Sequence, residues 1–141
     1  MPAPYRTIAC CIDRDEASAR VVEEASALCP PGDHGSLHLI HVLAPPLVLG
    51  PGPYAYDARP EETERAAREW LEELAAGLPG AVPVVLAGHP QRVVCSWARE
   101  NAADLIAAAA HRGVVDRALL GGFASFVAYH APCPVLLVRP I

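Results

Sequence analysis

Apolar and polar positions along the chain alternate between two patterns, one typical of buried strands and one of amphipathic helices. Nearly continuous apolar runs predict five strands, at Tyr5–Asp13, Leu37–Leu43, Ala81–Ala87, Asp104–Ala109 and Pro134–Arg139. Apolar residues at helical spacing predict four helices, at Asp15–Leu28, Glu61–Leu78, Pro90–Ala102 and Gly121–Ala131. Strands that are apolar on both faces and alternate with helices predict an α/β fold, with an open parallel sheet covered by helices on both faces.

Prolines and glycines mark the boundaries between these elements. The segment Ala44–Pro60 contains five prolines and two glycines, which predicts a long irregular loop. Its residues Tyr54 and Tyr56 either cover a bound ring or simply anchor the loop. Pro83 lies near the start of the third strand and favours an edge of the sheet, because proline cannot donate a ladder hydrogen bond.

Length and composition favour a single packed domain over residues 1–141, since 52% of the residues are apolar and 19% are charged. Five cysteines occur without a C-x-x-C pair, and we expect them to be reduced thiols that are either small buried apolar side chains or inert surface groups. The adjacent Cys10 and Cys11 would point to opposite faces of a strand. No apolar run approaches the roughly 20 residues of a membrane span, and the N-terminus lacks a signal-peptide pattern. These features predict a cytoplasmic protein without membrane contact.

The charge of the chain restricts its possible chemistry. The formal net charge is −5, which argues against a general nucleic-acid-binding protein. All eleven basic residues are arginines, so a phosphate-loop lysine and a Schiff-base lysine are excluded. A phosphate site in this chain must therefore use backbone amides, hydroxyl groups, arginine or histidine.

The first candidate for ligand binding is Asp13, at the end of the first strand. In open α/β sheets, ligands bind beyond the carboxyl ends of the strands. A carboxylate there can accept hydrogen bonds from an exocyclic amine or from a sugar hydroxyl. The alternative is that Asp13, or Asp15 after it, caps the first helix.

The second candidate is the segment Ala110–Gly122, between the fourth strand and the last helix. Gly121 and Gly122 precede a helix N-terminus, where backbone amides can bind an anion. His111 and Arg112, followed by Gly113, could add positive charge. The alternative is a glycine-rich turn with a solvated arginine.

The sequence shows no catalytic constellation and no metal-ligand motif. His38 and His41 are three residues apart on a strand, so they face opposite sides of the sheet. The chain lacks the G-x-S-x-G and H-E-x-x-H motifs and a Cys-His signature. We therefore expect a protein that is not an enzyme.

Short motifs along the whole chain resemble those of the universal stress protein family. The residues that carry the resemblance are Ile12–Ser18 (IDRDEAS), Leu37–Val42 (LHLIHV), Gly88–Pro90 (GHP), Ala103–Ile106 (ADLI), Leu119–Gly122 (LLGG) and His130–Arg139 (HAPCPVLLVR). The family implies the strand order 3-2-1-4-5 and frequent homodimers. It also implies that Asp13 and Val42 occupy positions that contact adenosine.

The chain departs from the family at the positions that bind the phosphates. ATP-binding members carry G-x2-G-x9-G-[ST], with the last two positions falling here on Gly121 and Gly122. The two earlier glycine positions fall on Ala108 and His111, or on Ala107 and Ala110 in the other alignment. A Cβ at these positions would keep a phosphate away from the backbone. The resemblance therefore implies that ATP or AMP binds more weakly than in ATP-binding members, or with fewer phosphates, or that nucleotide binding is absent.

Three functions follow as alternatives. The first is a stress-response protein with an adenine-nucleotide cleft, and the second is an interaction module whose cleft is empty. The third is an enzyme, either a slow nucleotide hydrolase or a thiol redox protein. In all three, the strand within residues 134–139 would be a sheet edge without lysine or internal proline, which predicts a homodimer through that strand.

Overall fold

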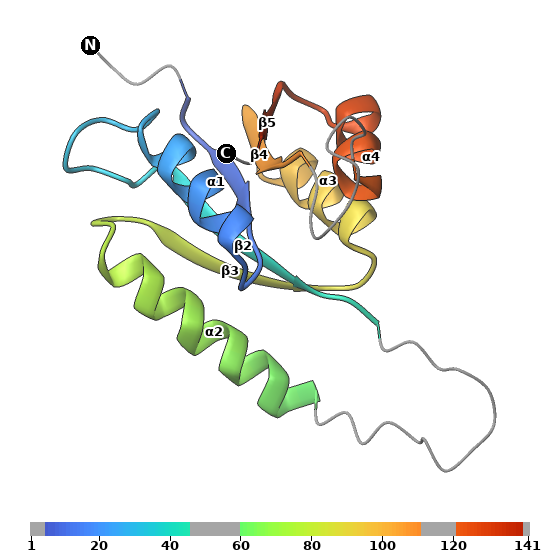
Figure 1. Cartoon of the computed structure of the whole chain (residues 1–141), viewed down its shortest axis with the longest axis horizontal. Coiled ribbons are helices and arrows are strands. Elements are labelled where there is room, and N and C mark those ends of the chain that lie inside the picture. The colour runs from blue at the N-terminus through green and yellow to red at the C-terminus, as the bar shows by residue number, and fades with distance from the viewer. Residues whose placement is uncertain (1–4, 46–59, 111–120, 140–141) are drawn as a thin grey trace.

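The computed structural model describes residues 5–45, 60–110 and 121–139, and strands alternate with helices throughout these ranges (Figure 1). In chain order the elements are β1 (Ile8–Cys11), α1 (Glu16–Ser26), β2 (Leu37–Leu43), α2 (Pro60–Ala76), β3 (Val82–Ala87), α3 (Pro90–Glu100), β4 (Leu105–Ala109), α4 (Gly122–His130) and β5 (Val135–Val138). Each element lies within, or one residue outside, a segment that the hydrophobic pattern predicts.

The strands form one parallel sheet in the order β3-β2-β1-β4-β5, which confirms the predicted fold class and strand order. Strand β1 is central, with Ile8 beside Leu37 of β2 and beside Leu105 of β4. The order reverses at β1, because the chain moves from β1 to β2 and β3 and then crosses back to β4. Ligands of open α/β sheets bind at such a switch point.

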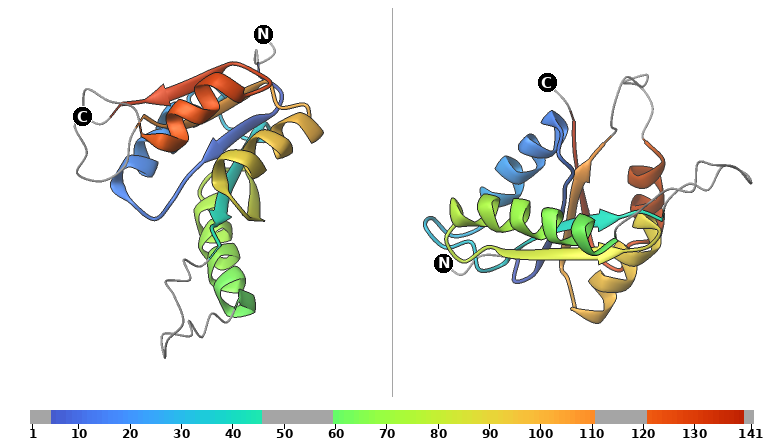
Figure 2. Two further views of the ribbon diagram at one scale, coloured as in Figure 1. Left: turned by 90° about the vertical axis from the view of Figure 1, so that its right-hand side faces the viewer. Right: turned by 90° about the horizontal axis from the view of Figure 1, so that it is seen from below.

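The helices cover both faces of the sheet, with α1 and α2 on one face and α3 and α4 on the other (Figure 2). Alternate residues of β1 enter the two cores, since side chains of a strand alternate in direction. Ile8 and Cys10 pack in the core beneath α1 and α2. Ala9 and Cys11 pack in the core beneath α3 and α4. Burial of apolar side chains on both faces explains the unbroken apolar strands.

The boundary of β1 differs from the predicted Tyr5–Asp13. The backbone N–H groups of Arg6 and Thr7 donate to the carboxylate of Asp104, at 2.8 and 3.0 Å, instead of to a strand. Helix α2 ends at Ala76 and not at the predicted Leu78, with Gly77 directly after it. These differences shorten the elements and leave the topology unchanged.

The two edges of the sheet are β3 and β5, as the pattern and the family resemblance predict. Pro83 lies in β3, which forms one edge of the sheet as predicted. Strand β5 forms the other edge and spans Val135–Val138, inside the predicted Pro134–Arg139. Among the described helices, none is long and apolar enough to span a bilayer.

Candidate functional site

The turn between β1 and α1 places two aspartates in different roles. Asp15 is the N-cap of α1, and its carboxylate accepts a hydrogen bond from the backbone N–H of Ser18 at 2.8 Å. The hydroxyl of Ser18 in turn accepts from the backbone N–H of Asp13 at 2.7 Å. Of the two capping alternatives, Asp15 is therefore the cap, and the carboxylate of Asp13 has other contacts.

His41 of β2 holds the carboxylate of Asp13. The Nδ1 atom of His41 lies 3.1 Å from Oδ1 of Asp13 and 3.0 Å from the carbonyl oxygen of Ile12. Both neighbours are acceptors when the carboxylate is ionised, so Nδ1 carries the hydrogen. The rings of His41 and of Trp70 in α2 pack in a T-shaped arrangement, with 5.2 Å between the ring centroids. The sequence alone did not predict this pair, although β1 and β2 are neighbours and both residues lie at their carboxyl ends.

His38 lies on the opposite face of the sheet from His41, as the strand pattern predicts. Its ring packs against Trp97 of α3 at 5.3 Å between centroids, and its Nδ1 lies 3.1 Å from the carbonyl oxygen of Ser36. The two histidines thus have similar local contacts, but only His41 reaches Asp13.

A cavity of about 280 Å³ lies at the carboxyl ends of β1 and β2, and we call it the cleft. Its lining residues are Cys11, Ile12, Asp13, Ile40, Val42, Ala44, Pro90, Val94 and Phe123. Asp13 and Val42, which the family resemblance singles out, therefore lie together in one cavity. Asp13 is the only charged residue among these lining residues. The apolar walls suit a flat ring system, whereas the aspartate offers an acceptor at one side.

Helices α3 and α4 supply the walls of the cleft that sequence reasoning missed. Gly88 precedes α3 with a φ of 131°, and a Cβ there would lie 2.8 Å from a side-chain carbon of Val93. The turn therefore requires glycine, and it places Pro90 at the cleft. Phe123, one residue into α4, lines the cleft from the other helix. Only the resemblance to G-x-P marked this turn, and no signal marked Phe123.

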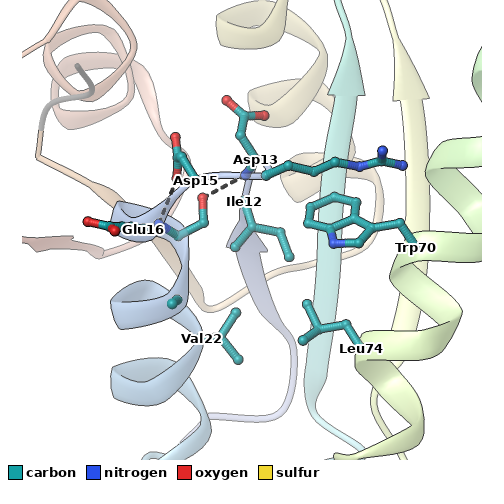
Figure 3. A pocket seen from close by; sticks show the side chains of 10 residues that line it. Ile12, Asp13, Asp15, Glu16, Val22, Trp70 and Leu74 are labelled. Carbon is teal, nitrogen blue, oxygen red and sulfur yellow. Dashed lines mark hydrogen bonds between the residues drawn. The ribbon is translucent and has the colours of Figure 1, made fainter.

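A second cavity, of about 670 Å³, lies between α1 and α2 on the opposite face of the sheet, and we call it the groove (Figure 3). Val22 and Leu74 face each other across it, with Trp70 on the α2 side. The guanidinium carbon of Arg14 lies 5.1 Å from the centroid of the Trp70 ring, and the same group donates to the carbonyl of Ala66 at 2.9 Å. Arg14 thus ties the β1–α1 turn to α2.

The groove and the cleft share one wall. Ile12 and Asp13 line both cavities, because they follow β1 at the carboxyl edge of the sheet. Figure 3 shows the Asp13 carboxylate directed away from the apolar residues at the base of the groove. No motif or pattern in the sequence indicated the groove.

The segment Ala110–Gly122, which the sequence predicts to bind phosphate, is described by the structure only at its two ends. Gly121 is the N-cap of α4, and its backbone N–H donates to the carbonyl of Ala110 at 2.9 Å. Gly122 begins the helix, and a Cβ there would meet no atom within 4 Å. Neither glycine is among the residues that line the cleft. His111, Arg112 and Gly113 lie outside the described residues, as do Tyr54 and Tyr56.

The cysteines behave as packing residues. Cys10, Cys11, Cys29 and Cys95 are buried and Cys133 is half-buried, all as free thiols. Burial raises the pKa of the Cys10 thiol well above its ordinary value, with the neighbouring Cys11 and Cys29 adding to the shift. Burial is also the main cause that raises the pKa of Cys29, Cys95 and Cys133. A raised pKa lowers the fraction of reactive thiolate, which favours packing over redox chemistry. Within the described ranges, no three potential metal ligands gather.

Similarity to known proteins extends over nearly the whole chain. The family model described as "Universal stress protein family" matches residues 4–139. The chain is 32% identical over 139 residues to a Thermus aquaticus universal stress protein from the QAH/OAS sulfhydrylase 3' region, covering 96% of this chain and 99% of that protein. It is also 32% identical over 143 residues to universal stress protein G of Escherichia coli O157:H7, with the same coverage.

Solved structures show the same fold at lower identity. A universal stress protein from Lactobacillus plantarum superposes with a TM-score of 0.70 at 23% identity, covering 96% of this chain and 98% of that one. An Arabidopsis thaliana protein with AMP bound gives 0.63 at 17% identity, with 96% and 92% coverage. A universal stress protein in complex with cAMP gives 0.63 at 20% identity, with 95% and 97% coverage.

Proposed function

Because the chain belongs to the universal stress protein family, we propose that it is a cytosolic stress-response protein that binds an adenine nucleotide in the cleft without catalysing a reaction. The observation that carries this proposal is the meeting of Asp13 and Val42 in one apolar cavity at the switch point of the sheet. The AMP-bound and cAMP-bound relatives support the same ligand class.

The cleft favours a nucleotide with few phosphates. Its volume of about 280 Å³ lies just below the roughly 300–1,000 Å³ that is usual for small-molecule pockets. The N–H of Gly121 already donates to Ala110, and Gly122 supplies no hydroxyl where ATP-binding members have serine or threonine. The loss of one hydrogen bond to a charged group corresponds to about a ten- to hundredfold loss of affinity. We therefore expect AMP to bind about as tightly as ATP.

Equilibrium dialysis with adenosine, AMP, ADP and ATP tests this function. The expected result is saturable binding of adenosine and AMP, with no large gain from further phosphates. ATP affinity that clearly exceeds AMP affinity would contradict the assignment of an altered phosphate site. If none of the four ligands binds, the alternative of an interaction module with an empty cleft is favoured. Phosphate release measured from bound ATP tests the slow-hydrolase alternative.

The proposal includes a homodimer through β5. This strand is an apolar edge whose described residues contain no lysine and no internal proline. An edge of this kind can pair with the same strand of a second copy about a two-fold axis. Tyr129 of α4, a helix that contacts β5, is 87% exposed.

A further inference from the structure

We propose that His41 is a positioning residue for nucleotide binding, which fixes the carboxylate of Asp13 as an acceptor for the hydroxyl groups of a ribose. This inference rests on the proposed function of the cleft and adds to it a residue that decides how the sugar is recognised. His41 does not line the cleft, so it acts through Asp13 and not through contact with the ligand.

The geometry holds Asp13 from two directions. The Ser18 hydroxyl holds its backbone N–H at 2.7 Å, and His41 Nδ1 lies 3.1 Å from its Oδ1 atom. The Asp13 side chain is 47% exposed, and a side chain with that exposure ordinarily samples several rotamers. Holding one rotamer before the ligand arrives removes part of the entropic cost of binding.

His41 is itself well fixed. Its side chain is only 17% exposed, and its Nδ1 also contacts the carbonyl oxygen of Ile12 at 3.0 Å. The Trp70 ring of α2 packs against it in a T-shaped arrangement. A donor held by the carbonyl of Ile12, directly after β1, and by an aromatic ring of α2 gives the Asp13 carboxylate a defined direction.

The other cleft residues explain why a sugar is the expected partner of Asp13. They are apolar apart from the Cys11 thiol, so their side chains suit the faces of a base, whereas the 47% exposed carboxylate of Asp13 suits the more polar part of the ligand, the sugar. Sugar hydroxyls are donors, and a hydroxyl that donates to a carboxylate forms one of the stronger classes of hydrogen bond. Loss of the His41 contact should therefore affect recognition of the sugar more than recognition of the base.

Calorimetric affinities for AMP and for dideoxy-AMP, which lacks both ribose hydroxyls, test the proposal. The wild type is expected to bind AMP about tenfold or more tightly than dideoxy-AMP. His41→Phe keeps a ring against Trp70 but lacks the donor. It should reduce the ratio of the AMP affinity to the dideoxy-AMP affinity to near one. His41→Asn offers an N–H near the position of Nδ1 and should restore part of the ratio. In the Asp13→Asn background, a further change of His41 to Phe should alter neither affinity.

His38→Phe is the matched control, since His38 lies on the same strand with a similar carbonyl and tryptophan contact but does not reach Asp13. It should leave the ratio at its wild-type value. A ratio that persists in His41→Phe, or that falls equally in His38→Phe, would overturn the proposal. Melting temperatures identify any variant that fails to fold, and His41→Asn then carries the test.

Crystal structures of the wild type and of His41→Phe without ligand separate this inference from the proposed function. The Asp13 carboxylate is expected to adopt a different rotamer in the variant. An unchanged carboxylate would overturn the positioning role whatever the binding data show. If the carboxylate moves and the wild type binds no nucleotide, the proposed function fails and the role in ribose recognition fails with it.

Discussion

The hydroxyl oxygen of Ser18 accepts a hydrogen bond from the backbone N–H of Asp13 at 2.7 Å. Ser18 is 3% exposed and is the one buried polar residue of the described chain. Through this bond the first turn of α1 fixes the backbone at the end of β1, directly beside the cleft. The Ser18 side chain therefore belongs to the first turn of α1 and also fixes the backbone of Asp13, the candidate ligand contact.

Substitution of Ser18 by Ala should destabilise the fold by about 1–3 kcal/mol, because it leaves the Asp13 N–H without its acceptor in a partly buried place. Urea unfolding measures this change. Ser26→Ala is the matched control in the same helix, since its hydroxyl donates to the carbonyl of Glu23 in an exposed turn. We expect the control to cost less than about 0.5 kcal/mol. Equal effects of the two variants would contradict the role of Ser18.

The two aspartates of the β1–α1 turn should separate binding from stability. Asp15→Ala removes the N-cap and should destabilise the fold by about 1 kcal/mol with little change in nucleotide affinity. Asp13→Ala should lower AMP affinity about tenfold or more, toward that for dideoxy-AMP, and cost less stability, because the cap remains. Parallel measurements of the melting temperature and of AMP affinity check both expectations. A large stability loss in Asp13→Ala with unchanged affinity would reverse the assigned roles.

The buried Cys10 thiol predicts a specific alkaline instability. Its folded pKa is raised well above the ordinary 9.0, so above that pH the unfolded chain releases a proton that the folded chain retains. Stability is therefore unaffected below about pH 9 and falls as the pH rises further. Urea unfolding between pH 7 and pH 10.5 should show a shallower fall in Cys10→Ala than in the wild type. The half-buried Cys133 is the control. Cys133→Ala should reduce the loss of folding stability at alkaline pH less than Cys10→Ala does.

The hydrogen-bond pattern of β5 decides how a dimer variant is designed. Ile106 N–H donates to the carbonyl of Pro134, and Ala110 N–H donates to that of Val138. Alternation in a parallel ladder then directs the amide of Leu136 toward β4 and the amide of Leu137 outward. Proline at position 137 should remove an outward donor only, whereas proline at position 136 should break the sheet itself.

Light scattering and circular dichroism test the dimer with these two variants. Wild type should be a dimer, and Leu137→Pro should be a monomer that keeps its helical spectrum. Leu136→Pro should lose stability in the same experiment. A wild type that is monomeric at micromolar concentration would contradict a β5 interface, as would a Leu137→Pro variant that remains dimeric.

Hydrophobic periodicity, together with the positions of proline and glycine, was sufficient to predict the strands and helices and the order in which they follow along the chain. Burial of β1 on both faces, for example, follows directly from its unbroken apolar run. The strand order came from the family resemblance, because periodicity does not specify which strands are neighbours. The choice of Asp15 over Asp13 as the cap depended on backbone geometry, since both residues precede the same helix.

The candidate site was predictable only in part, for a related reason. Asp13 and Val42 were identified by motif, and each belongs to a segment with a recognisable pattern. The His41–Asp13 pair and the Phe123 wall depend on contacts between residues 28 or more positions apart. Helix α4 gave no polar motif at Phe123, so only its packing shows that it faces the cleft.

Pro83 limits how far such chains can assemble. Gly88 N–H donates to the carbonyl of Leu43, so the ladder alternation places the amides of Val84 and Leu86 toward β2 and position 83 outward. The proline therefore removes a donor from the exposed side of β3, the side on which a further strand would have to add. The β5 edge of the sheet can therefore pair with another strand, whereas the β3 edge lacks a donor that such pairing needs. A dimer formed through β5, as proposed, would therefore close on itself as a pair and would not continue into an extended, fibre-like sheet.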